Sequence, residues 1–346
     1  MRTVVRAPGR LYGFAVMDSH VTPGDDGGSA VPGRVTRLDR GWSTVLLDDG
    51  RSVRVRNVGT EVAVGDRVTV DAAVERIESV EERRSALTRR NSFEGARALR
   101  QIVAANIDTV FLVHAVTAPP NERRLERELV LAFDSGAQPV VVLTKTDAVD
   151  GAYVQEVIEV LSQVALGVEI VAVSSITGAG LGGVRAHCGP GQTVAFIGAS
   201  GVGKSTLVNA LVGREVQRTG EVRDDDQRGR HTTVAAELIA LPDGGWLLDT
   251  PGLRAVTLWT SGHGIERAFR DVFDLADHCR FRDCRHIDEP GCAVGTAITE
   301  GRLRPERLES MRRLVAEEAA LEDEQWEREK QFDRRGARRR PGKRGG

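Results

Sequence analysis

The chain has 346 residues, which at roughly 100 to 200 residues per domain is enough for two or three domains, each with its own core. With 40% hydrophobic and 28% charged residues, the composition excludes a collagenous, a wholly disordered and a small disulfide-stapled protein. The formal net charge is −2, and only four of the 48 basic residues are lysines. No run approaches the roughly 18 apolar residues of a membrane span, and the start lacks a signal-peptide core, so we expect a cytoplasmic protein with no membrane partner.

The N-terminal region predicts a small β-barrel behind a flexible lead-in. Residues 1–30 contain the Gly-, Asp- and Pro-rich run TPGDDGGSAVPG, which is typical of a flexible segment. From 31 to 90, short alternating runs such as GRVTRL, STVLLDD and DRVTVDA lie between Gly and Asp turns. They predict a barrel of the oligonucleotide-binding (OB) type, although an SH3-like barrel would have a similar sequence. Such a barrel either contacts nucleic acid or is purely structural.

Residues 91–262 show a different pattern, in which nearly continuous apolar runs such as IDTVFLVHAV and QPVVVLTK alternate with amphipathic segments. This alternation predicts a doubly wound α/β domain with a mainly parallel sheet, whose ligands bind at the carboxyl ends of the strands. Residues 263–332 predict a helical module interrupted by a cluster of cysteine and histidine residues.

The last segment, 333–346, carries the basic run RRGARRRPGKRGG and is predicted to be a disordered tail. From Arg334 onward it has six arginines, one lysine and no acidic residue, so the rest of the chain is acidic. Such a tail either binds a phosphate backbone in a salt-dependent way or is a solvated end.

A glycine-rich phosphate loop follows the apolar strand TVAFI and precedes the helical segment TLVNALVG. In this context glycines let backbone N–H groups surround phosphate oxygens at a helix N-terminus. Lys204 reaches the β- and γ-phosphates, which makes it a predicted catalytic residue, and Ser205 can ligate Mg²⁺. We expect the nucleotide phosphates to be bound by Gly198, Ala199, Ser200, Gly201, Val202, Gly203, Lys204, Ser205 and Thr206.

A candidate guanine motif, TKTD, ends another buried strand and comprises Thr144, Lys145, Thr146 and Asp147. A carboxylate at this edge of the sheet accepts from N1–H and the 2-amino group of guanine, donors that adenine lacks. Lys145 would lay its aliphatic stem over the base. One helix later, Ser174 and Ser175 end a further buried strand and could offer backbone N–H groups to guanine O6. Together with the phosphate loop, these residues predict a site for GTP and GDP.

A third phosphate element is the strand WLLD with the following TPG, which delivers Asp249 toward Mg²⁺ and brings the Gly252 amide to the γ-phosphate. Upstream, the polar segment RTGEVRDDDQRGRHTTV is typical of a mobile switch loop, in which Thr232 or Thr233 can close over Mg²⁺ through a hydroxyl. The Mg²⁺ ligands expected from these motifs are Ser205, Thr233 and Asp249.

The cysteine and histidine cluster, Cys279, Cys284, His286 and Cys292, offers three thiolates and one imidazole within 14 residues. This is a complete tetrahedral shell for one Zn²⁺, and a shell without an open position is structural rather than catalytic. The alternative is a set of free cysteines beside an unrelated histidine. Cys188 is expected to be an ordinary small residue.

The motifs follow the order TKTD, VSS, GASGVGKS, HTT and DTPG, whereas Ras-like GTPases begin with the phosphate loop. From about residue 30 to about residue 320, this order resembles the bacterial family of circularly permuted GTPases called ribosome small-subunit-dependent GTPase A. The resemblance implies an N-terminal barrel, a permuted GTPase domain and a C-terminal zinc module. Thr144 replaces the usual Asn of the guanine motif, a variation compatible with this family.

His231 is the candidate for orienting the attacking water, both by its chemistry and by the family resemblance. Ras-like proteins use a Gln after the DxxG motif, and here that place holds Leu253, which cannot polarise water. We therefore expect His231, Lys204 and Gly252 to form the catalytic set. The alternative for His231 is a solvated loop residue.

The resemblance implies a GTP hydrolase that binds the small ribosomal subunit and its rRNA and is stimulated by that subunit. It would act as a GTP-dependent checkpoint or release factor in late maturation of the subunit, and we expect it to be monomeric off the ribosome. Two alternatives stay open. One is an RNA-binding scaffold whose nucleotide is structural, and the other is a metabolic P-loop phosphotransferase, against which TKTD and DTPG argue.

Overall fold

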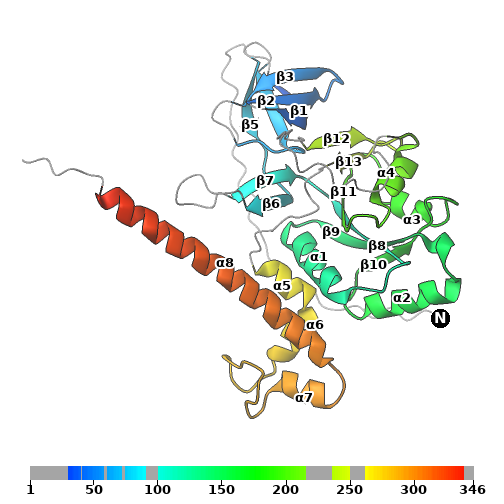
Figure 1. Cartoon of the computed structure of the whole chain (residues 1–346). Coiled ribbons are helices and arrows are strands. Elements are labelled where there is room, and N and C mark those ends of the chain that lie inside the picture. The colour runs from blue at the N-terminus through cyan, green and yellow to red at the C-terminus, as the bar shows by residue number, and fades with distance from the viewer. Residues whose placement is uncertain are drawn as a thin grey trace, which may run out of the picture.

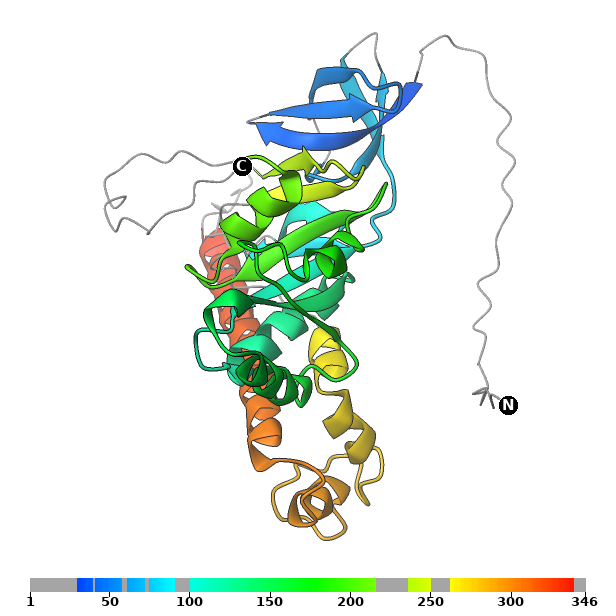
Figure 2. The ribbon, with the colours of Figure 1, turned by 90° about the vertical axis from the view of Figure 1, so that its right-hand side faces the viewer.

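The computed structural model describes residues 30–39, 41–57, 61–71, 75–90, 100–215, 236–249 and 262–338. The described residues form three bodies stacked along one axis, with a β-barrel at one end, an α/β sheet in the middle and a helical module at the other end (Figure 1 and Figure 2). Among the described helices, none is both long and apolar enough to cross a lipid bilayer.

The barrel closes on itself, because its strands pair in the order β1-β2-β3-β5-β4 and β4 pairs back onto β1. Neighbouring strands are antiparallel except β3 and β5, which are parallel. Alternate side chains of β2 and β4 are buried in a core of valine, leucine and isoleucine residues. The OB-like barrel expected from the alternating runs is thus confirmed. Its strands are β1 (Ala30–Asp39), β2 (Trp42–Leu47), β3 (Ser52–Arg56), β4 (Arg67–Asp71) and β5 (Arg76–Val80).

The segment that ends the predicted barrel does not belong to it. β6 (Ala86–Arg90) pairs with β7 (Arg100–Ala105) in a separate antiparallel hairpin. The reason is burial, since Leu87 joins the core of the α/β sheet rather than that of the barrel. Ser85 anchors the hairpin by exchanging hydrogen bonds with the backbone of Ile107, at 2.6 Å each.

The central sheet has the order β10-β9-β8-β11-β13-β12, in which β12 is antiparallel to β13 and the other pairs are parallel. Alternate residues of the buried strands enter two separate cores, so Leu112 lies under α1 and α2 whereas Phe111 lies under α3 and α4. Helices therefore cover both faces, and the doubly wound fold expected from the apolar runs is confirmed. The elements are β8 (Thr109–Ala115), α1 (Glu122–Asp134), β9 (Gln138–Thr144), the 3-10 helix η1 (Thr146–Ala148), α2 (Gly151–Ser162), β10 (Glu169–Ala172), α3 (Leu181–Arg185), β11 (Thr193–Gly198), α4 (Lys204–Val212), β12 (Glu237–Ala240) and β13 (Trp246–Asp249).

The helical module packs beside α1 through the first part of its long last helix. Leu308, Met311 and Leu314 of that helix are buried in the same core as α1, and its second half extends beyond the other elements in Figure 1. The helices are α5 (His263–Ala268), α6 (Arg270–Ala276), α7 (Ala293–Thr299) and α8 (Pro305–Arg338).

The end of α8 corrects the expected boundary of the disordered tail. The helix continues to Arg338, so residues 333–338 are helical. Arginine and alanine favour helices, and the first proline after Pro305 is Pro341, so the basic composition did not mark the end of the helix. Residues 339–346 lie outside the described part of the chain.

A buried arginine joins the barrel to the central sheet. Arg34 of β1 donates to the hydroxyl of Thr193, the first residue of β11, and to the carbonyl of Asn106. Burial lowers the pKa of Arg34 to about 10, so the guanidinium stays charged at neutral pH. β1 also pairs with β12 at Arg37 and Glu237, so the two sheets are hydrogen-bonded to each other.

Candidate functional site

The phosphate loop runs from the end of β11 to the start of α4, in the context that the sequence predicts. A Cβ atom at Gly198 would lie 2.4 Å from the carbonyl oxygen of Val113 on the neighbouring strand β8, so only glycine fits there. Gly203, the N-cap of α4, has φ +95°, which also favours glycine. These two positions let the loop turn tightly and direct the N-terminus of α4 at the carboxyl edge of the sheet.

Lys204 lies folded over this loop. Its Nζ donates to the carbonyl of Gly198 at 2.7 Å and to that of Ala199. The ammonium is thus held at the loop, where a phosphate chain bound to the backbone N–H groups would meet it. Ser205 follows in the first turn of α4 and is half-buried, while Thr206 is exposed.

The guanine motif contacts the phosphate loop directly, although 58 residues separate Thr144 from Val202. The Thr144 hydroxyl makes a short hydrogen bond to the Val202 carbonyl, and Lys145 Nζ donates to the Gly201 carbonyl at 2.7 Å. Lys145 has φ +61°, a left-handed turn that directs the chain from β9 into η1. Asp147 is exposed in η1, as a carboxylate that reads a base must be.

The two serines after β10 have different surroundings. The backbone N–H of Ser174 donates to the carbonyl of Ala179 at 2.9 Å, and its hydroxyl accepts from the Thr177 N–H at 3.1 Å. Ser174 is 1% exposed, so its amide cannot serve guanine O6 as we expected. The amide of the half-buried Ser175 is the one of the pair that stays a candidate for that contact.

The expected Mg²⁺ ligands are in part brought together by the fold. Asp249 ends β13, which lies beside β11, so its carboxylate is at the same edge of the sheet as Ser205. Four predicted residues, His231, Thr232, Thr233 and Gly252, lie outside the described residues.

The four candidate metal ligands converge in the helical module, with all ligand atoms within 4.8 Å of one another. The Sγ atoms of Cys279 and Cys292 are 4.0 Å apart, and His286 Nδ1 lies 3.6 Å from the first and 3.5 Å from the second. A tetrahedral Zn²⁺ with bonds of about 2.0 to 2.3 Å would separate its ligands by about 3.5 to 3.8 Å. The donor set and its spacing therefore fit one zinc ion.

The loop around this cluster is held in place by its own backbone contacts. Glu289 accepts from the N–H groups of Arg285 and Ile287 on either side of His286, and Arg312 of α8 donates to the His286 carbonyl. Burial, aided by the Arg312 charge, lowers the pKa of His286 and favours the neutral imidazole that a metal requires.

Comparison with known proteins assigns the chain to a family. A family model described as RsgA GTPase matches residues 80–259. The chain belongs to the RsgA GTPase family. A small ribosomal subunit biogenesis GTPase RsgA of Streptomyces coelicolor is 42% identical over 296 residues, which cover 83% of this chain and 80% of that protein. A relative of the same name from Methanosarcina acetivorans is 40% identical and covers 79% of this chain and 74% of its own length.

Two solved structures resemble this RsgA-family chain. YjeQ of Thermotoga maritima has 27% sequence identity and a TM-score of 0.61, and the match covers 84% of this chain and 99% of that one. YloQ, described as a circularly permuted GTPase, has a TM-score of 0.62 at 22% identity, with 84% and 96% covered, and supports the fold alone. Membership of a GTPase family makes the protein a hydrolase whose ligands are GTP, GDP and Mg²⁺.

An aromatic residue on the barrel of this RsgA-family protein was missed by the sequence reasoning. The guanidinium groups of Arg54 and Arg56 of β3 each lie 5.1 Å from the centroid of the Trp42 ring on β2. Strands 2 and 3 form the oligonucleotide-binding face of OB folds. The signal was present in the run RSVRVR, where the arginines alternate with valines at the period of a strand.

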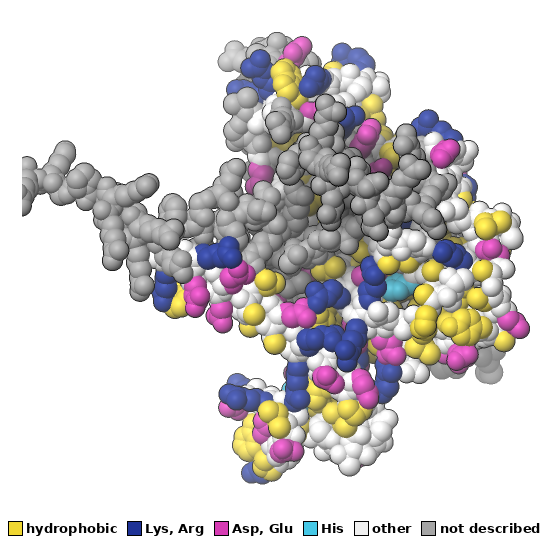
Figure 3. Space-filling model, viewed as in Figure 1, with side chains coloured by type: hydrophobic (Ala, Val, Ile, Leu, Met, Phe, Trp, Pro, Cys, Tyr) yellow, Lys and Arg dark blue, Asp and Glu magenta, His cyan; other side chains and the backbone are white. Residues whose placement is uncertain are grey.

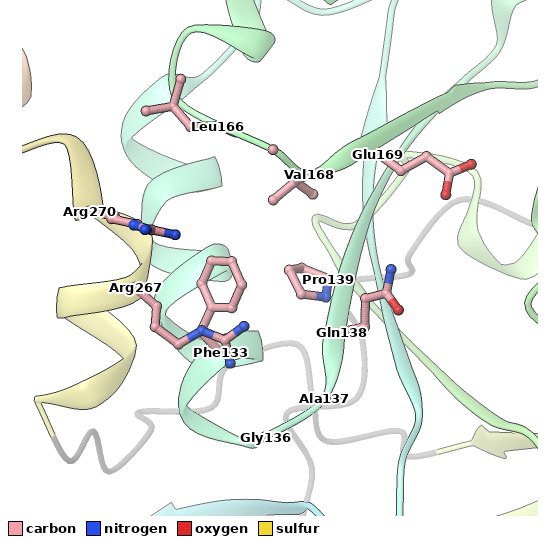
Figure 4. Close-up of a pocket in the computed structure, with 11 residues that line it drawn as sticks. Phe133, Gly136, Ala137, Gln138, Pro139, Leu166, Val168, Glu169, Arg267 and Arg270 are labelled. Carbon is pink, nitrogen blue, oxygen red and sulfur yellow. The ribbon is translucent and has the colours of Figure 1, made fainter. Parts of the chain in front are cut away.

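A cavity of about 570 Å³ lies between the central sheet and the helical module. Phe133, Pro139 and Leu166 line it, and Arg267 of α5 stacks on Phe133 at 4.5 Å (Figure 4). It opens near the first residues of β9, whereas Thr144 is the last residue of that strand. The cavity is therefore at the opposite end of the sheet from the nucleotide motifs.

Proposed function

We propose that this protein hydrolyses GTP in the maturation of the small ribosomal subunit, which stimulates its turnover, and that it acts as a GTP-dependent checkpoint or release factor. The relatives that bear the name small ribosomal subunit biogenesis GTPase support the ribosomal role. The observation that supports the GTPase assignment most is the direct contact of Thr144 and Lys145 with the phosphate loop, because a base-reading motif and a phosphate loop must lie side by side to bind one nucleotide.

In this proposal each predicted site residue has its own role in binding or hydrolysing GTP. Lys204 neutralises charge on the β- and γ-phosphates, and Gly252 donates its amide to the γ-phosphate. Ser205, Thr233 and Asp249 hold Mg²⁺, which neutralises phosphate charge when bound. His231 orients the attacking water, since Leu253 at the usual place of that group is apolar.

Each segment of the chain has its own part in the proposal. The barrel within 31–90 contacts rRNA, 91–262 binds GTP, and the module 263–332 is kept folded by one structural Zn²⁺. The lead-in 1–30 has no proposed role, and the basic tail reinforces binding to phosphate backbones. The protein is monomeric off the ribosome and works in the cytoplasm.

The test is GTP turnover by the full chain with and without purified small ribosomal subunits. We expect the subunits to raise turnover by at least about tenfold, because the water-orienting residue at the usual place is absent. Lys204→Ala should lower the stimulated rate by about a hundredfold or more. His231→Ala should suppress the stimulated rate while GDP affinity stays near that of the wild type.

Other results would favour the alternatives. Turnover that does not respond to subunits would fit an RNA-binding scaffold with a structural nucleotide. Equal competition by ADP and GDP for the site would fit a metabolic phosphotransferase. Unchanged stimulated turnover in His231→Ala would remove this residue from the mechanism.

A further inference from the structure

The hydroxyl of Thr144 is enclosed by backbone carbonyls. Thr144 is 2% exposed, and its Oγ1 lies within hydrogen-bonding distance of the carbonyls of Val202, in the phosphate loop, and of His114 at 3.2 Å, on β8. A threonine hydroxyl has a single proton to donate. That proton is therefore engaged within the protein, whichever of the two carbonyls takes it.

The phosphate loop covers this hydroxyl. A Cβ atom placed on Gly203 would lie 3.4 Å from Thr144 Oγ1 and 3.9 Å from Lys145 Cε, so the loop backbone passes directly over the side chain. The Lys145 ammonium is itself bonded to the Gly201 carbonyl. No face of the Thr144 side chain is open to a ligand at the protein surface.

Guanine presents two donors, N1–H and the 2-amino group, and two acceptors, O6 and N7. Asp147 suits the two donors, and the amide of Ser175 suits O6. N7 would need a further donor. An asparagine at position 144 has two N–H donors and could serve a loop carbonyl and a base acceptor together, whereas threonine has one proton and uses it on a carbonyl.

We propose that Thr144 acts as a tether between β9 and the phosphate loop and that this protein recognises guanine without a side-chain hydrogen bond from position 144 to N7. This inference rests on the proposed function, since it concerns the specificity of the same nucleotide site. Its consequence is tolerance of a guanine in which N7 is replaced by C–H.

The experiment compares GDP with 7-deaza-GDP, each displacing a fluorescent guanine nucleotide from the full-length protein. For the wild type we expect the two dissociation constants to agree within about twofold. Thr144→Asn supplies an additional donor, so the ratio of dissociation constants should rise to about three- to tenfold, the effect of one neutral hydrogen bond. Thr144→Ser keeps a single hydroxyl proton, and its ratio should stay near one.

Thr144→Val tests the contact with the phosphate loop separately from recognition of the base. It should weaken GDP and 7-deaza-GDP equally, because the loop loses its anchor while N7 was never contacted. Thermal unfolding of each variant would show that it is folded.

Two results would overturn the inference alone. One is a wild-type ratio of the 7-deaza-GDP to the GDP dissociation constant of three or more, at normal GDP affinity, and the other is a ratio that stays near one in a folded Thr144→Asn protein. Failure of the wild type to bind any guanine nucleotide would overturn the proposed function together with it.

Discussion

The four cysteines lie in two chemically different surroundings. Cys188, before β11, is 1% exposed, and burial raises the pKa of its thiol to about 11. Its thiol is therefore neutral near physiological pH, and the thiolate is the reactive form. Cys279, Cys284 and Cys292 instead converge with His286 near the surface of the helical module.

Burial and the expected metal, rather than pKa alone, predict the order in which the thiols react, because a chelator frees the three clustered cysteines but leaves Cys188 inside the sheet core. At about pH 8, iodoacetamide should modify none of the four in the zinc-loaded protein, three after removal of the metal by a chelator, and all four after denaturation. Mass spectrometry counts the added groups. Cys188→Ala should leave the count after chelation at three and lower the denatured count by one. Modification of Cys188 in the folded, zinc-loaded protein would contradict its buried, raised-pKa state.

Residues that carry chemistry through their type and spacing could be predicted from the sequence. Two such features are found where the motifs indicate: Lys204 lies on the phosphate loop, and the four candidate metal ligands converge. The tether made by Thr144 could not be predicted, since it depends on a contact between segments 58 residues apart. Nor could the sequence show that the Ser174 amide is unavailable to guanine, because that depends on how the following turn folds back and brings the Ala179 carbonyl to it.

At the scale of elements, α1 is the helix on which the helical module is assembled. Arg307 of α8 is buried and binds Glu126 of α1 at 2.8 Å and Asp271 of α6 at 3.1 Å, and it stacks on Phe269 at 4.3 Å. Ser310 donates to the other oxygen of Glu126. Three helices thus share one buried cluster of charges.

Breaking this cluster should destabilise the protein strongly. Arg307→Met leaves the buried Glu126 carboxylate without its cation, and we expect the free energy of unfolding to fall by about 3 to 5 kcal/mol. The matched control is Arg302→Met, which removes an exposed pair with Glu300 and should cost about 0 to 1 kcal/mol. Denaturant titrations measure both. Equal small losses in the two variants would show that the cluster contributes little to stability.

The types of the elements followed from hydrophobic periodicity, but some of their limits did not. The parallel strands are apolar on both faces, and such runs indicate a sheet that is covered by helices on both faces. The pairing of β6 with β7 depends instead on which core receives Leu87, and both cores are apolar. The end of α8 at Arg338 was missed because a basic run can be either helical or disordered.

At the scale of the whole molecule, many basic side chains are paired with acidic neighbours. On the face shown in Figure 3, basic and acidic side chains interleave over α1 and α8. Arg127 of α1 pairs with Glu317 of α8, and Arg304, just before α8, pairs with Glu122 of α1. Cations that are already paired within the protein are poor candidates for binding phosphate. On the barrel, Arg56 lies beside the Trp42 ring, and Arg54, beside the same ring, forms a longer ion pair with Asp39, at 3.9 Å, so this face is the better candidate for contact with RNA.

This location predicts how RNA binding should respond to mutation. Trp42→Ala should weaken binding of a fluorescent single-stranded RNA by about 1 to 3 kcal/mol, whereas Trp42→Phe retains a stacking ring and should lose much less. Arg56→Ala should flatten the dependence of log affinity on log salt by about 0.7 if one phosphate contact is lost. Fluorescence anisotropy at several salt concentrations measures both effects. Equal affinities of the wild type and Trp42→Ala would rule out this face.

Hydrogen bonds join the barrel to the nucleotide region. β1 pairs with β12, and Arg34 holds the first residue of the phosphate-loop strand, so we expect the two regions to keep one relative orientation in solution. If the two regions were joined by a flexible linker, the GTP site could take many positions around a barrel that is bound to RNA. With the junction formed by Arg34 and β12, docking of the barrel on RNA would also set the orientation of the GTP site relative to that RNA.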